Sequence, residues 1–125
     1  MQRAGVVAVR DGRGVAAAVS ADLAAARDRL VGALNAIPGI DAIAPPGAMY
    51  LFLKLPGSAD SLAFCKRLVA EASIGLAPGI AFGPEGEGFV RWCYACSPAM
   101  LDEGVRRLRA FLGLPDLLDQ IACNT

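Results

Sequence analysis

Two short apolar segments, each bounded by proline and glycine, most constrain how this chain can fold. The first, AMYLFLK over residues 48–54, lies between a Pro-Pro-Gly turn and a Pro-Gly pair. The second, FVRWCYA over residues 89–95, follows the loop PGIAFGPEGEG. Aromatic and aliphatic runs of this length between turn residues predict β-strands. The first segment is apolar on both faces for most of its length, so we expect it to lie centrally in a sheet.

Three segments with helical periodicity surround these strands. The first covers residues 20–37, with Ser20 able to cap its first turn. Residues 58–73 form a second amphipathic pattern, and a third helix begins at Pro98, with Ser97 as its N-cap. Residues 74–77 predict a further short strand. This order predicts an α/β (α+β) two-layer sandwich, in which a small mixed or antiparallel sheet carries helices on one face.

Composition excludes several classes of function. The chain has 125 residues, and 55% of them are hydrophobic. Every apolar run is shorter than the roughly 20 residues that a membrane-spanning helix needs, so we expect no membrane insertion. The N-terminus lacks the pattern of a secretory signal, and we expect a cytoplasmic protein. The net charge is zero without clustered basic residues, which argues against nucleic-acid binding.

The four cysteines are Cys65, Cys93, Cys96 and Cys123, and the chain has no histidine. Cys93 and Cys96 form a C-x-x-C, but a zinc site needs a second closely spaced ligand pair, so we expect no metal site. A redox C-x-x-C lies at the start of a helix after a strand, whereas Cys93 falls inside a predicted strand. We expect reduced cysteines that pack as small hydrophobes, and the role of Cys93 and Cys96 stays open.

Arg91 is an unusual residue for an apolar strand. Because side chains alternate along a strand, Arg91 should share one face with Phe89 and Cys93. A buried guanidinium needs an anion, and its planar fork suits a carboxylate or a phosphate. The residues alone leave three interpretations: an ion pair with Glu85 or Glu87, a strand end whose side chain reaches water, or the binding of an external anion.

Three blocks of the sequence resemble a known family. The blocks are IPGIDAIAPPGAMYLFLKL (37–55), IGLAPGIAFGPEGEGFVRWCYA (74–95) and LDEGVRRLRAFL (101–112). In this order they resemble the C-terminal region of class I and II aminotransferases, the fold type I enzymes that depend on pyridoxal phosphate. The resemblance covers about residues 2–112. It implies that residues 1–19 are a connector from the large domain, residues 20–114 the small C-terminal domain, and residues 115–125 a tail.

The resemblance also implies roles for individual residues. In the family, the arginine of the block that reads GFVRWCYA here binds the α-carboxylate of the amino-acid or 2-oxo-acid substrate, which would make Arg91 the substrate-binding residue. A fixed carboxylate clamp orients the substrate for reaction. The loop containing Pro78, Gly79, Phe82 and Gly83 would shape the wall of the pocket, although these residues could also form a plain turn.

The chain departs from the family where the cofactor is concerned. Transamination needs a lysine that attaches pyridoxal phosphate covalently. The chain's two lysines, Lys54 and Lys66, do not follow the family's motif, and no glycine-rich phosphate cradle leads into a helix. We therefore expect no catalytic residue in this chain and no activity from it alone.

Two hypotheses of function follow. The first is the carboxylate-binding part of a transaminase that pairs with a large domain and forms a homodimer. The second is a non-catalytic module that uses the same fold for dimerisation or for binding a small carboxylate. The sequence does not reveal which amino acid would be the substrate.

Overall fold

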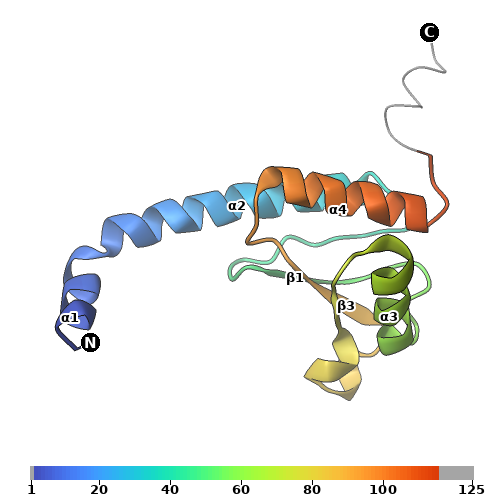
Figure 1. Ribbon diagram of the computed structural model, residues 1–125, viewed down its shortest axis with the longest axis horizontal. Helices are drawn as coiled ribbons and strands as arrows, with labels where there is room; N and C mark the ends of the chain where they lie inside the picture. The colour runs from blue at the N-terminus through green and yellow to red at the C-terminus, as the bar shows by residue number, and fades with distance from the viewer. Residues whose placement is uncertain (1, 116–125) are drawn as a thin grey trace, which may run out of the picture.

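The computed structural model describes residues 2–115, and its elements alternate between helices and short strands (Figure 1). Their order is α1 (Gln2–Asp11), α2 (Arg13–Asn35), β1 (Tyr50–Lys54), α3 (Ser61–Ala72), β2 (Ala77–Pro78), the 3-10 helices η1 (Gly79–Phe82) and η2 (Pro84–Gly86), β3 (Phe89–Cys93) and α4 (Pro98–Phe111). This arrangement confirms the predicted α+β class. The part of the expected tail after Pro115 lies outside the described residues.

The sheet has three strands in the order β1-β3-β2, and both pairings are antiparallel. The prediction that the first strand lies centrally is wrong, because β1 is an edge strand and β3 occupies the centre. Burial explains the error: along β1 exposed and buried residues alternate, so only one of its two apolar faces contacts the core. The predicted strand over residues 74–77 is also displaced, since β2 begins only at Ala77.

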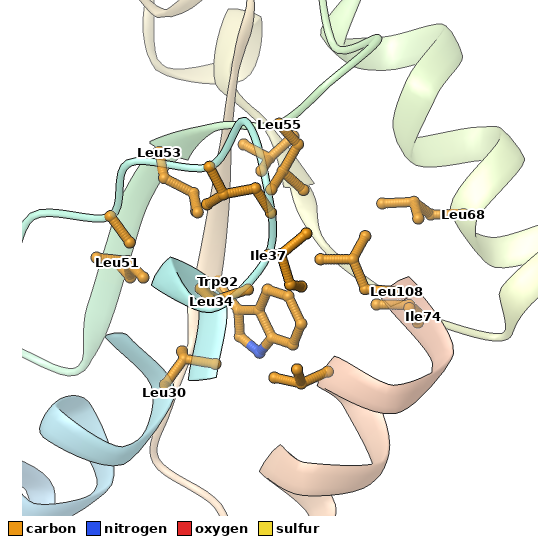
Figure 2. Close-up of a cluster of buried hydrophobic side chains, with 14 of the residues drawn as sticks. Leu30, Leu34, Ile37, Leu51, Leu53, Leu55, Leu68, Ile74, Trp92 and Leu108 are labelled. Carbon is orange, nitrogen blue, oxygen red and sulfur yellow. The ribbon is translucent and has the colours of Figure 1, made fainter. Parts of the chain in front are cut away.

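A single hydrophobic core lies between the sheet and the helices. Figure 1 shows α2 and α4 lying along one side of the sheet, and α3 packs against α4 and β2. Figure 2 shows leucines from β1 and from α2 converging on Trp92 of β3. The largest fully buried side chains include Leu30, Leu34, Ile37, Leu51, Leu68, Val90, Leu101 and Leu108. Burial of such side chains stabilises the fold by about 1.5–3 kcal/mol each, before the entropy of ordering is subtracted.

The N-terminal ends of α2 and α3 differ from the predictions, whereas that of α4 agrees. Ser20 does not cap a helix, because α2 begins at Arg13 and runs through that position. Helix α3 begins after Asp60, whose carboxylate accepts a hydrogen bond from the backbone N–H of Ala63 at 2.9 Å. The prediction for α4 is confirmed, since the Ser97 hydroxyl caps the helix and accepts from the N–H of Met100.

The N-terminal part of the chain extends away from this core. Figure 1 shows the first half of α2 projecting beyond the sheet, with α1 at its far end. Only Leu30 and Leu34 of α2 are buried, and both lie in its second half. Within residues 2–115, no helix combines the length and the apolar character that crossing a membrane requires.

Candidate functional site

The face of the sheet turned away from α2 and α4 carries aromatic and basic side chains. The register pairs Phe52 with Arg91 and Lys54 with Phe89, and residues opposite each other in an antiparallel pair point to the same side. We call this surface the open face and define it by Tyr50, Phe52, Lys54, Phe89 and Arg91. The predicted alternation along β3 is confirmed, because Val90 and Trp92 are buried while Arg91 is half-buried.

Arg91 lies against two aromatic rings. Its Cζ atom is 4.2 Å from the ring centroid of Tyr50 and 4.3 Å from that of Phe82. A guanidinium close to a ring face is held by the ring's quadrupole, and planar stacking restricts its rotation. Tyr50 comes from β1 and Phe82 from η1, so three separate segments fix the position of this side chain.

Arg91 has no anionic partner among residues 2–115. Glu87, one of the two predicted partners, instead accepts hydrogen bonds from the backbone N–H groups of Ser61 (2.7 Å) and Gly88 (3.0 Å). These bonds hold the pKa of the Glu87 carboxyl below its usual value. None of the ion pairs between described residues involves Arg91 or Glu85, which argues against the interpretation of Arg91 as part of an internal ion pair. Within residues 2–115 no carboxylate pairs with the Arg91 guanidinium, so its donors face water or an external anion.

An apolar floor extends from Arg91 along the open face. The rings of Phe52 and Phe89 are stacked with centroids 5.1 Å apart, and Phe82 meets Phe52 edge-on at 6.0 Å. At the far end the Nζ atom of Lys54 lies 4.8 Å from the Phe89 centroid. Phe52 and Phe82 are 43% and 50% exposed, so these rings remain accessible. An anion with an apolar body therefore meets a cation and a hydrophobic surface at once.

The loop that carries Phe82 is fixed by a close crossing of two backbones. A Cβ atom at Gly79 would collide with the carbonyl oxygen of Gly86 and would lie 2.6 Å from that of Phe89. Glycine at this position is therefore required by space. Gly83, which separates η1 from η2, has φ +120°, a value that side chains disfavour. Pro78 pairs with Val90 in the sheet and so anchors the start of this loop. The four residues predicted to shape a pocket wall, Pro78, Gly79, Phe82 and Gly83, therefore lie close together along one short segment.

The two lysines do not fit a covalent site for pyridoxal phosphate. Lys54 contacts Phe89 at the end of β1, and Lys66 is exposed on α3. Neither lies in an enclosed site that would keep water from a cofactor, and both side chains are exposed to solvent.

Comparison with known proteins shows the family to which the chain belongs. The profile of the family "Aminotransferase class I and II" matches residues 1–108. The chain belongs to the class I and II aminotransferase family. It is 32% identical over 108 residues to the LL-diaminopimelate aminotransferase of Oleidesulfovibrio alaskensis, covering 86% of this chain and 28% of that enzyme.

Other aminotransferases give the same result. The aspartate aminotransferase of Thermotoga maritima is 42% identical over 74 residues, which are 59% of this chain and 19% of that enzyme. The solved structure of N-succinyldiaminopimelate aminotransferase from Mycobacterium tuberculosis superimposes with a TM-score of 0.79 at 30% identity, covering 87% of this chain and 29% of that one. The chain thus spans less than a third of the length of these relatives.

Tyr50 is the site residue that sequence reasoning missed. Its aromatic side chain was visible in the first strand, but its position beside Arg91 depends on the register between β1 and β3. Phe52 was likewise predicted only as a strand residue, whereas Phe89 was predicted to share a face with Arg91. Strand register is set by pairing across the sheet, which one strand's pattern does not reveal.

Proposed function

We propose that this chain forms the small, C-terminal domain of a pyridoxal-phosphate-dependent aminotransferase and binds the carboxylate of its amino-acid or 2-oxo-acid substrate. The observation that carries the proposal is Arg91, a half-buried guanidinium held between Tyr50 and Phe82 without an anion among the described residues. A carboxylate accepts two parallel hydrogen bonds from such a fork. The clamp would fix the orientation of the substrate's α-carbon.

The proposal divides the work of the enzyme between segments. Residues 20–114 would form the substrate-binding domain and residues 1–19 a connector to a large domain, which would supply the covalent lysine and the phosphate site. The poor fit of Lys54 and Lys66 to a cofactor site supports this division. The complete enzyme would act as a cytoplasmic homodimer, and the 125-residue chain alone would be inactive. Pro78, Gly79, Phe82 and Gly83 would form one wall of the substrate pocket.

A chimaeric enzyme tests the role of Arg91. This chain would replace the segment that it matches in the Thermotoga maritima aspartate aminotransferase, and steady-state kinetics would be measured with amino acid and 2-oxo acid. Loss of charge-assisted hydrogen bonds worth about 3 kcal/mol predicts that Arg91→Leu raises KM roughly 100-fold. Binding of pyridoxal phosphate, followed by its absorbance, should not change.

A matched variant and a labelling experiment complete this test. Arg67→Leu removes an exposed arginine on α3, paired with Glu71, and should leave KM unchanged. Equal KM values for the two variants would remove Arg91 from the site. The isolated chain would also be mixed with pyridoxal phosphate and reduced with borohydride. A stoichiometric adduct on Lys54 or Lys66 would contradict the proposed division between domains.

A further inference from the structure

Cys93 and Cys96 lie at the junction between a strand and a helix. Cys93 is the last residue of β3, and Cys96 directly precedes Ser97, the N-cap of α4. The sequence predicted that Cys93 lies inside a strand extending to residue 95, which argued against a redox role. In the structure Cys93 is a strand residue paired with Tyr50, so this placement is confirmed, but the strand ends two residues earlier than predicted and leaves residues 94–96 as the connection to α4.

A three-residue turn lies between the two cysteines. The N–H of Cys96 donates a hydrogen bond to the carbonyl oxygen of Tyr94 at 2.9 Å, a three-residue turn. Tyr94 itself is anchored, because its N–H donates to Met49 and its hydroxyl to the carbonyl of Ala48 at 3.0 Å. This buried tyrosine anchors the chain directly after Cys93.

Both cysteines line one open groove of about 600 Å³. Its other walls come from Trp92, from the segment that joins α3 to β2, and from the first turns of α4. Cys93 is exposed and Cys96 is half-buried, so a small reagent can reach the pair. Burial raises the pKa of the Cys96 thiol, and the nearby Cys93 raises it further.

Cys65 provides a contrast within the same chain. It is 5% exposed, on the inner face of α3, and burial raises the pKa of its thiol. A thiol that is both buried and protonated reacts slowly. The groove is therefore the part of the described structure in which two cysteines are accessible together.

We propose that Cys93 and Cys96 form a dithiol modification site, which a low-molecular-weight disulfide converts into an intramolecular disulfide. The exposed Cys93, as its thiolate, attacks one sulfur of the reagent, forms a mixed disulfide and releases one thiolate. Cys96 then loses its proton to solvent and attacks the Cys93 sulfur, which expels the second thiolate. In sum, two protein thiols are oxidised and one reagent disulfide is reduced to two thiols.

The bond should be readily reversible. It would close a loop of only four residues and lie at an exposed groove. Strained or exposed disulfides are more easily reduced than structural ones. The proposal is independent of the substrate-binding role of Arg91, since it needs only the geometry of residues 93–96 and the groove.

Peptide mapping of the oxidised chain tests this site. The reduced 125-residue chain would be exposed to glutathione disulfide, quenched with acid, alkylated and digested with trypsin. Cleavage after Arg91 and Arg106 places Cys93 and Cys96 in one peptide, whereas Cys65 and Cys123 fall in others. We expect that peptide to be unalkylated and lighter by two hydrogens, and mild dithiothreitol to restore both thiols.

Variants make the outcome unambiguous. Cys65→Ser and Cys123→Ser should leave the bond intact, whereas Cys96→Ser should trap glutathione on Cys93. Three results would overturn the proposal: a stable glutathione adduct on Cys93 in the unmodified chain, pairing of Cys93 with Cys123 or with another chain, or the same yield of the internal bond in urea as in buffer. The last result would show that the folded turn does not bring the thiols together.

Discussion

Replacing Gly79 by alanine should destabilise the fold by about 2 kcal/mol. The new methyl group would collide with the carbonyl oxygen of Gly86 and lie 2.6 Å from that of Phe89. Both obstacles are backbone atoms, so no change of rotamer relieves the contact. Overpacking of this kind costs about 1–3 kcal/mol, and we take the upper end. The lower entropy of the unfolded chain offsets about 0.4–1 kcal/mol of that cost.

Urea unfolding followed by tryptophan fluorescence would measure this change. Trp92 is the single tryptophan and is 6% exposed, so its emission reports on the core. With a denaturant slope of about 2 kcal/mol per molar, the unfolding midpoint should fall by about 1 M. The effect should also reach the open face, because Gly79 begins the 3-10 helix that positions Phe82 against Arg91.

Gly75→Ala is the matched control for this experiment. Gly75 lies four residues earlier, between α3 and β2, is exposed, and has no atom within 4 Å of an added Cβ. Its replacement should leave the midpoint unchanged or raise it slightly. Equal midpoints for the two variants would refute the reasoning, because they would show that the crossing of Gly79 and Gly86 leaves room for a methyl group.

Two further predictions concern charges on α4. Hydrogen bonds from Arg106 and Arg107 lower the pKa of the Glu103 carboxyl to about 2, so its stabilising contribution is complete above pH 4.5 and is lost as the pH falls toward 2. The urea midpoint of the unmodified chain should therefore fall more between pH 5 and pH 2 than that of Glu103→Gln, and parallel curves would contradict this. Arg109 is 4% exposed, and its Nε and Nη1 atoms have no acceptor within residues 2–115. Arg109→Met should raise the free energy of unfolding by about 1–3 kcal/mol. The exposed control is Arg67→Met. A lower urea midpoint for Arg109→Met than for this control would show that the Arg109 guanidinium has its hydrogen-bond acceptors.

Local rules predicted the parts of the fold that depend on one segment. The pleat alone determines which face of a strand each residue occupies, so the sequence predicts correctly that Arg91 lies on the face opposite to that of Val90 and Trp92. The start of α4 was also readable, because a serine cap followed by Pro98 is a local signal. These features needed no knowledge of what the segment packs against.

Features that depend on tertiary pairing were not predicted. The start of α2 was missed because its first half contacts little, so it carries no apolar stripe, and its alanines form the helix through propensity instead. The central position of β3, and with it the contact between Tyr50 and Arg91, followed only from the sheet order. Arg91 itself was recognised because a guanidinium in an apolar strand is costly wherever that strand lies.

The place of β1 at the edge of the sheet has a consequence for the solubility of the chain. β1 pairs with β3 on one side, and within the described residues no strand covers its other side. A row of unpaired backbone groups of this kind is a template for strand addition by a second copy. Its sequence, YLFLK, carries a single charge, that of Lys54. Lysine on an edge strand opposes such joining, so this residue, which fits no cofactor site, protects the exposed edge against aggregation.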